Sequence, residues 1–167
     1  PYIMGELKKY NAKATFFCIG ENVEKYPENY RQYINEGHAV ANHTQHHING
    51  WKSADDIYLG DIAEAAKSID SKLFRPPYGR MKRSQVRRIN KEAGLTIVMW
   101  NILAGDWVPE LSPEKCYQRI KKKIKAGDII VLHESDKSWD RMSYVLPRLL
   151  YDFSKQGFQF LAITPKK

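Results

Sequence analysis

The sequence predicts an α/β fold in which short buried strands alternate with helices. Runs of β-branched and aromatic residues recur along the chain with little alternation of polar and apolar positions, as in strands buried on both faces of a parallel sheet. Helical segments lie between these runs, and glycine, proline and serine separate the segments. The chain is therefore expected to form a parallel sheet or barrel of βα units. The six expected strands are residues 13–20, 38–42, 72–75, 95–102, 128–134 and 158–163.

Serine residues mark the start of three expected helices, because a serine hydroxyl can accept a hydrogen bond from a free N–H group of the first turn. These helices are residues 54–69 after Ser53, 85–94 after Ser84, and 114–127 after Ser112 and Pro113. Gly94 and Gly127 are expected to end the second and third of them. A further helical segment, residues 1–12, opens the chain where a βα fold begins with a strand, so the first strand of the fold is expected to be missing from this chain.

Composition favours one globular domain covering residues 1–167, since 43% of the residues are hydrophobic. No apolar run approaches the roughly 20 residues that a membrane-spanning helix requires, so no membrane-spanning segment is expected. Cys18 and Cys116 are too few for a disulfide framework and are expected to be ordinary core thiols.

The formal net charge of +8 is compatible with an anionic partner, but its densest run indicates a helix surface. In residues 119–125, Ile120 and Ile124 lie four positions apart with basic residues between them, as on an amphipathic helix. The sequence contains no phosphate-binding glycine motif and no RNA-binding aromatic motif. A nucleic-acid partner is therefore not expected.

Polar residues with chemical potential follow four of the expected strands. His43 and His47 follow the second strand, the segment RPPYG at residues 75–79 follows the third, Asp106 and Trp107 follow the fourth, and His133 ends the fifth. In parallel α/β folds the carboxyl ends of the strands share one rim, where ligands bind. These residues are therefore expected to meet in one cleft.

Two of the histidines are candidate metal ligands. His43 and His47 have i, i+4 spacing, which on a helical turn directs both imidazoles to one side, although such spacing also occurs in hydrogen-bonded loops. Two histidines would leave an open zinc shell that needs a third ligand, commonly a carboxylate, and a water. His38 and His46 receive no assigned role.

The other candidates each have a chemical and a structural interpretation. His133 is a candidate general acid that Asp106 could keep protonated, or a strand-end histidine bonded to the backbone. The two prolines after Arg75 would present its side chain and the backbone N–H of Tyr78 rigidly, which suits an oxyanion hole or a loop with a structural ion pair. Trp107 is a candidate wall for a sugar ring, or a packing residue.

Taken in order, these segments resemble the motif series of the polysaccharide deacetylases, carbohydrate esterase family four. EGHAVANHTQHH contains an H[ST]xxH motif at His43 and His47, RPPY is similar to the RxPY motif, and IIVLH is similar to the closing motif with His133. The segment KKYNAKATFFCIGENV resembles the second strand of the family with its flanks, and Asp106 with Trp107 resembles the fourth motif. The resemblance extends over essentially the whole chain.

The resemblance implies a distorted (β/α)7–8 barrel and a divalent metal, usually zinc, bound by two histidines and an aspartate. It implies the following roles: His43 and His47 as metal ligands, Arg75 orienting a catalytic aspartate, the Tyr78 N–H binding the oxyanion, Asp106 tethering the general acid His133, and Trp107 and Leu132 lining the acetyl pocket. The first motif of the family, TFDD, supplies the base and the metal-binding aspartate, and it does not occur in this sequence.

The function expected from the resemblance is removal of acetyl groups from N- or O-acetylated sugars, such as chitin-like oligomers or peptidoglycan. Two alternatives stay open: a carbohydrate-binding homologue without catalytic activity, and an amide hydrolase of small nitrogenous molecules. The family resemblance favours the cell envelope or a secreted location.

Overall fold

The computed structural model describes residues 2–165, which form two compact units. Among these residues, the large unit contains residues 13–99 and 162–165, and the small unit contains residues 2–12 and Trp100–Leu161. Each unit is described by itself. That the chain is a single domain stays a prediction.

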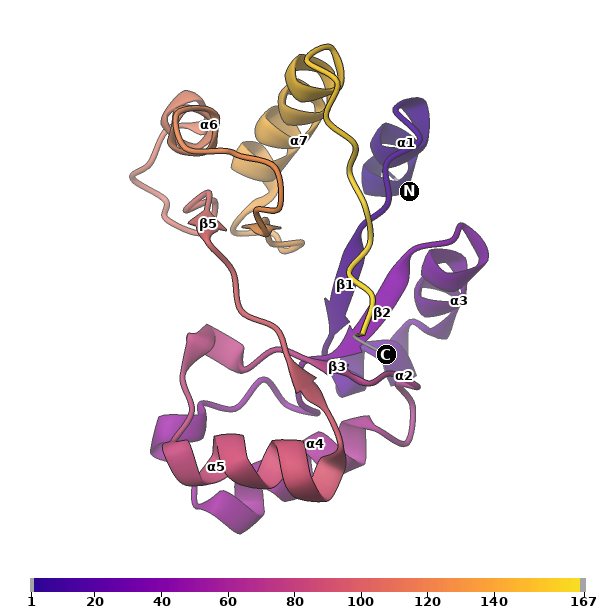
Figure 1. The fold of residues 1–167 in the computed structure, drawn as a ribbon, viewed down its shortest axis with the longest axis vertical. Coiled ribbons are helices and arrows are strands. Elements are labelled where there is room, and N and C mark those ends of the chain that lie inside the picture. The colour runs from indigo at the N-terminus through magenta and orange to yellow at the C-terminus, as the bar shows by residue number, and fades with distance from the viewer. Residues whose placement is uncertain (1, 166–167) are drawn as a thin grey trace. The chain divides into compact units, whose positions relative to one another are not determined.

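A four-stranded parallel sheet forms the centre of the large unit (Figure 1). The strands are β1 (Thr15–Cys18), β2 (Ala39–Asn42), β3 (Leu73–Phe74) and β4 (Thr96–Ile97), and they pair in that order. Phe17 pairs with Ala41 in the register of β1 and β2. Asn42 pairs with Phe74, and Phe74 with Ile97. The parallel arrangement predicted from the apolar runs is confirmed for these strands.

Helices connect the strands of the large unit and bury its apolar side chains. They are α2 (Gly20–Lys25), α3 (Pro27–Asn35), the short 3-10 helix η1 (Gly50–Lys52), α4 (Asp55–Ala65), the turn η2 (Pro77–Gly79), α5 (Arg83–Arg88) and the π-helical turn η3 (Ile89–Ala93). Tyr58 and Ile62 of α4 pack with Phe74 and Ile89 in one core cluster, and all four are at most 2% exposed. This packing fixes the carboxyl ends of β2 and β3 against α4.

The small unit contains a pair of parallel strands and three helices. They are α1 (Tyr2–Lys9), β5 (Ile102–Leu103), α6 (Pro113–Lys121), β6 (Ile130–Val131) and α7 (Trp139–Ser154). Its core joins Ile120 of α6 to Val145 and Leu149 of α7, and the two helices lie side by side in Figure 1. Ile120 is fully buried and Ile124 is partly buried, whereas Lys121, Lys122 and Lys123 are exposed, so the burial pattern predicted from the basic run is confirmed, although α6 itself ends at Lys121.

The helix ends match the sequence in part. Ser112 caps α6 as predicted, its hydroxyl accepting from the N–H of Lys115 at 3.3 Å, and Gly94 ends η3 with a φ of 61°. Ser53 and Ser84 are not caps. Ala54 is the N-cap residue of α4 and Lys82 that of α5, where the side-chain oxygen of Gln85 in the first turn accepts from the Lys82 N–H at 2.8 Å.

Other expected elements were wrong. α6 ends at Lys121, so Gly127 lies in a later turn and does not end the helix. The strand expected at residues 95–102 is two short strands, β4 and β5, which belong to different units. Residues 158–163 form no strand in the described chain, and α2, α3 and α7 were not predicted. Among the described residues, no helix has the length and apolar character needed to cross a lipid bilayer.

Candidate active site

The two candidate metal ligands lie in a tight turn directly after β2. The N–H of His43 donates to the carbonyl oxygen of Cys18 at 2.9 Å, which extends the pairing of β1 and β2 by one residue. Thr44 and His47 then have positive φ values of 67° and 54°. Such values are uncommon for residues other than glycine and persist where the surrounding structure fixes them. A non-helical turn therefore brings the two imidazoles together, and the prediction of a helical turn from the i, i+4 spacing was wrong.

Neighbouring elements hold this turn in its strained conformation. The buried side chain of Asn42 accepts from the Thr44 N–H at 2.9 Å and donates to the carbonyl oxygen of Ile62 at 3.0 Å. The N–H groups of Gly20 and Glu21, at the start of α2, donate to the carbonyl oxygens of Thr44 and Gln45 at 3.0 and 3.2 Å. A side chain at Gly20 would collide with that of Gln45, so glycine permits this close approach.

Asp61 on α4 binds the backbone of the same turn at Gln45 and His46. Its carboxylate oxygen Oδ2 accepts from the N–H groups of Gln45 and His46 at 2.9 and 3.1 Å, and Oδ1 lies 2.6 Å from Nδ1 of His46. The carboxylate is mostly buried, and its hydrogen bond raises the pKa of His46. His46 is thereby a partner of Asp61 and is positioned away from a ligand role.

The geometry of His43 and His47 fits a shared metal ion. Their ring centres lie 5.0 Å apart. Two imidazoles bound to one tetrahedral zinc have ring centres roughly 5 Å apart, because each Zn–N bond is about 2 Å long. The Nδ1 of His43 lies 2.6 Å from the carbonyl oxygen of Arg75, which can only accept, so Nδ1 carries the proton and Nε2 is left as the donor atom for a metal.

A complete metal shell is not found within residues 2–165. No group of three or more histidine, cysteine, aspartate or glutamate side chains in the described chain is arranged to bind a metal. The donors present therefore fit one half of a zinc site. The third protein ligand that the family resemblance implies stays a prediction.

Arg75 is buried at the end of β3, 6% exposed. Its Nε donates to the carbonyl oxygen of Val98 at 3.0 Å, one terminal nitrogen donates to that of Met99 at 3.0 Å, and the guanidinium lies 3.7 Å from the ring centre of Phe17. Burial lowers the pKa of Arg75 to about 10. The side chain thus fixes the segment after β4 against the sheet, and its role in orienting a catalytic aspartate stays a prediction.

Tyr78 has the conformation that presents its backbone N–H group. Its φ is 60° within the turn η2, and its ring centre lies 4.8 Å from that of His47. The N–H groups of Gly79 and Arg80 donate within this turn, to the carbonyl oxygens of Pro76 and Pro77. Among the described residues, the Tyr78 N–H has no such acceptor. It is therefore available to an external oxygen, as an oxyanion hole requires.

In the small unit, Asp106 and His133 form a closely bonded pair. Asp106 is fully buried. Its Oδ2 atom accepts from the backbone N–H of His133 at 2.6 Å, and its Oδ1 atom lies 2.9 Å from Nδ1 of the same residue. The His133 side chain is 44% exposed. Because the carboxylate accepts from Nδ1, the Nε2 atom is the one that can exchange a proton with a substrate.

The two expected substrate-binding residues flank this pair. The ring centre of Trp107 lies 4.9 Å from that of His133, with the rings nearly perpendicular, and Trp107 is 41% exposed. Leu132 is partly buried against the core of the small unit. Their assignment to an acetyl pocket stays a prediction.

The structure therefore groups the eight candidates into two sets of four. The large unit holds His43, His47, Arg75 and Tyr78, and the small unit holds Asp106, Trp107, Leu132 and His133. The four groups of the large unit are in contact as described above, as are Asp106, Trp107 and His133 in the small unit, whereas Leu132 packs on the core of that unit. The single rim expected from the sequence stays a prediction, because the described strands form one sheet in each unit.

Sequence reasoning missed Asp61 and Asn42, which hold the metal-binding turn. Asn42 ends a strand next to His43, which is a usable signal, whereas no short spacing connects Asp61 to the histidines. His38, which had no assigned role, accepts from the Ala14 N–H through Nδ1 at 3.1 Å and is buried. It is a structural histidine of the large unit.

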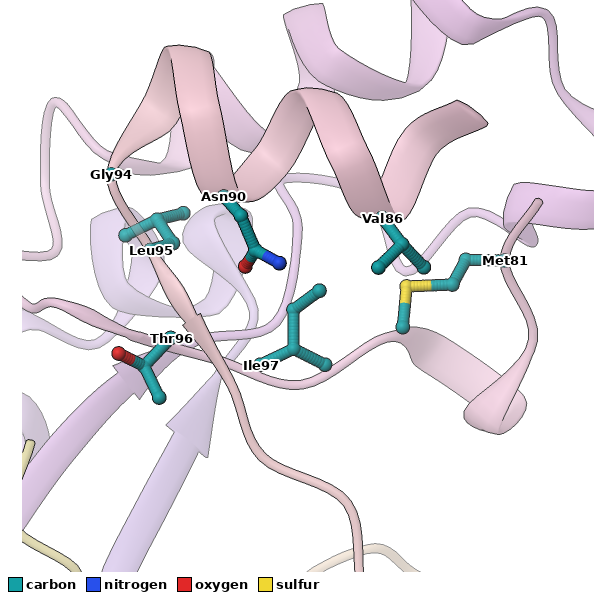
Figure 2. Close-up of a pocket in the computed structure, with 7 residues that line it drawn as sticks. All are labelled: Met81, Val86, Asn90, Gly94, Leu95, Thr96 and Ile97. Carbon is teal, nitrogen blue, oxygen red and sulfur yellow. The ribbon is translucent and has the colours of Figure 1, made fainter. Parts of the chain in front are cut away.

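The large unit also has a pocket that none of these candidate residues lines. It has a volume of about 530 Å³ and is lined by α5, η3 and β4 (Figure 2). Met81, Val86 and Ile97 extend into it, and Asn90 supplies a polar group. None of the side chains that line it is ionisable, so it offers no acid, base or metal ligand.

Comparison with known proteins identifies a family and relatives for this chain. A family model described as polysaccharide deacetylase matches residues 1–98. A peptidoglycan-N-acetylglucosamine deacetylase of Bacillus cereus is 32% identical over 98% of this chain and 79% of its own length. The chain spans smaller shares, 58% and 34%, of two further relatives that carry the same enzyme name.

Solved structures have the same fold. A peptidoglycan N-acetylglucosamine deacetylase in complex with a substituted N-hydroxybenzamide is 29% identical, with a TM-score of 0.90 over 98% of this chain and 78% of that one. A carbohydrate esterase family four pseudoenzyme from Bacillus anthracis has a TM-score of 0.82 over 98% of this chain and 58% of that one, and its 24% identity shows a likeness of fold alone.

The α/β fold with parallel strands and the paired histidines after β2 define the class of protein as a sugar deacetylase of the α/β type. The chain belongs to the polysaccharide deacetylase family. The resemblance predicted from the motifs, the fold class and the enzyme class are confirmed at the level of the family.

Proposed function

We propose that this chain is a metal-dependent hydrolase that removes acetyl groups from an N-acetylated polysaccharide, with His43 and His47 as metal ligands. One observation carries the proposal: the imidazole rings lie 5.0 Å apart, and the Arg75 carbonyl oxygen fixes the protonated nitrogen of His43. Neutral imidazoles whose second nitrogen donates to a backbone oxygen are typical metal ligands.

Zinc suits this donor set, and when bound it would polarise the acetyl carbonyl group and lower the pKa of a water molecule. The residues of the chain have separate tasks. The N–H of Tyr78 binds the oxygen that becomes negative as the carbonyl carbon is attacked. This N–H takes no part in the hydrogen bond that closes its own turn, which runs from the Gly79 N–H to the Pro76 carbonyl oxygen, so no rearrangement is needed when the charge develops.

His133 has the chemistry of the proton donor for the departing amine. Nδ1 is held by the Asp106 carboxylate, so Nε2 is the nitrogen that carries the transferable proton. Burial of Asp106 and the second bond from the His133 backbone keep the ring in one orientation. Trp107, in contact with the same ring, would restrict the position of the acetyl group.

The substrate class follows from the relatives, whose names specify peptidoglycan N-acetylglucosamine. We infer that an oligomer of N-acetylglucosamine, whether chitin-like or part of peptidoglycan, is the substrate of this chain. Removal of the acetyl group from nitrogen yields acetate and a free amine, both of which can be measured directly.

The test is acetate release from N-acetylglucosamine oligomers by the 167-residue chain, before and after chelation and with zinc restored. Zinc-dependent release that is lost in His43→Ala supports the proposal. If wild-type protein binds both zinc and the oligomer in calorimetry but releases no acetate, the chain is instead a carbohydrate-binding homologue. If it releases products from small amides and none from the oligomers, the amide-hydrolase alternative is correct.

A further inference from the structure

We propose that Trp51 is a stacking surface for a second sugar unit of the polysaccharide, next to the unit that loses its acetyl group. This inference rests on the proposed function and names a part of the substrate site that the motifs do not include. Trp51 lies in η1, four residues after His47, and is 58% exposed. A tryptophan this exposed presents a large apolar surface to water.

Trp51 is exposed but firmly held. Its ring nitrogen Nε1 donates to the carbonyl oxygen of Met81 at 2.9 Å, and its backbone N–H donates to the side-chain oxygen of Asn49 at 3.0 Å. Both N–H groups of the residue are thereby satisfied within the protein, which leaves the ring face away from Arg80 for an apolar contact. A rigid aromatic ring binds a ligand with a small loss of conformational entropy.

The loop that carries Trp51 is fixed to the loop that follows Tyr78. Gly50 approaches so closely that a side chain there would lie 2.8 Å from the carbonyl oxygen of Arg80 and 3.0 Å from the Cα of Met81. The buried side chain of Gln85 donates to the Gly50 carbonyl oxygen at 2.9 Å. Residues 49–53 and 78–82 therefore form one continuous surface of the large unit.

This surface is continuous with the candidate metal ligands. Tyr78, which is 60% exposed, contacts the ring of His47, and Arg80 follows two residues later with its guanidinium 5.1 Å from the ring centre of Trp51. Trp51 follows His47 by four residues, and four residues of extended chain span at most about 14 Å between Cα atoms. The exposed indole thus lies within the reach of a short oligosaccharide whose reacting unit is bound at His47.

The chemistry of this surface matches a sugar ring. A pyranose of N-acetylglucosamine has C–H bonds on its faces and hydroxyl groups at its rim, so it packs an apolar face on an aromatic ring while its rim forms hydrogen bonds. Trp51 supplies the aromatic ring, and Arg80, whose guanidinium lies over one face of that ring, supplies planar N–H donors, so the sugar packs on the opposite face. The ligand of this surface is therefore an N-acetylglucosamine oligomer.

The experiment measures binding, separately from turnover. Wild-type chain labelled with nitrogen-15 is titrated with N-acetylglucosamine monomer and tetramer, and the four indole N–H signals are followed by NMR, with that of Trp51 assigned from Trp51→Phe. We expect the tetramer, and not the monomer, to shift the Trp51 signal. Trp51→Ala should weaken tetramer binding about five- to tenfold and leave monomer binding unchanged, whereas Trp51→Phe should lose less.

Trp139→Ala is the matched control, because Trp139 is also a solvent-exposed tryptophan, 44% exposed, but packs on Tyr2 in the small unit. It should bind the tetramer like wild type. An unchanged affinity in folded Trp51→Ala, or equal losses for monomer and tetramer, would overturn the inference, as would a wild type that does not bind the tetramer. Absence of acetate release with these binding results intact would contradict only the proposed function.

Discussion

The Nδ1 atom of His43 lies 2.6 Å from the carbonyl oxygen of Arg75, and this contact joins the two motifs of the large unit. The RPPY segment thereby determines which nitrogen of His43 faces a metal. The N–H of Arg75 in turn donates to the carbonyl oxygen of Asn42 at 3.0 Å, the residue before His43. Pairing of β2 with β3 therefore places the metal-binding turn and the oxyanion segment in a fixed relation within one unit.

The first prediction concerns metal affinity. His43→Ala and His47→Ala should each weaken zinc binding by at least about 100-fold, because changes to groups that merely support a ligand already cost about 10- to 100-fold. Competition with a chromophoric chelator measures the Kd. His133→Asn is the control: it should bind zinc like wild type and lose acetate release. Equal zinc affinity in wild type and His43→Ala would exclude His43 as a ligand.

The sequence predicts the parts of this site that depend on local chemistry. The apolar runs identified β1, β2 and β3 because strands buried on both faces need no polar alternation. The polar residues after β2 and β3 were found because ligands bind at the carboxyl ends of parallel strands. Prolines after Arg75 correctly indicated a rigid turn at Tyr78. The pairing of Asp106 with His133 was also expected, and the structure places them in contact.

Features that depend on tertiary contacts were not predictable. Asp61 binds the turn at residues 44–46 only because α4 packs its apolar face on the sheet, and no sequence spacing encodes that approach. The positive φ of Thr44 and His47 is imposed by surrounding hydrogen bonds on residues that ordinarily avoid it. Serine before a helix was an unreliable signal, since α5 begins after Lys82, whose N–H donates to the side chain of Gln85, and Ser84 lies inside the helix.

The second prediction tests Asp61 as a positioning residue for the metal-binding turn. Asp61→Ala removes the acceptor of two backbone N–H groups, so zinc affinity should fall about tenfold and the free energy of unfolding by about 1–3 kcal/mol. Asp61→Asn keeps one oxygen acceptor and should recover part of both losses. Asp56→Ala, on the exposed side of the same helix, is the control, with its carboxylate paired to Arg88 at the surface. A loss of stability with unchanged zinc affinity would limit Asp61 to a structural role.

The third prediction concerns the pair in the small unit. Asp106→Asn removes the carboxylate that accepts from Nδ1 and holds the His133 ring in one tautomer and orientation, so acetate release should fall by about 100- to 10,000-fold. His133→Asn should fall by a similar factor, and the double variant should be little worse than either single variant, because the two residues act as one unit. Rates on an N-acetylglucosamine oligomer with saturating zinc provide the measurement. Additive losses in the double variant would show that the residues act separately.

The fourth prediction is a pH dependence of stability from His38. Burial lowers the pKa of this imidazole below its ordinary value of 6.5, nearby Lys13 lowers it further, and Glu36 opposes the shift. Between the lowered pKa and 6.5 the unfolded chain binds more protons than the folded chain, so the free energy of unfolding rises with pH through this window and is constant above it. Below the window the protein is destabilised, because a protonated Nδ1 cannot accept from the Ala14 N–H. The measurement is urea unfolding between pH 5 and pH 7.5, a range around the ordinary histidine pKa of about 6.5. The free energy of unfolding should change less with pH in His38→Asn than in wild type, because the amide oxygen accepts the same hydrogen bond without titrating. Identical slopes in the variant and in wild type would assign the acid sensitivity of the fold to other groups.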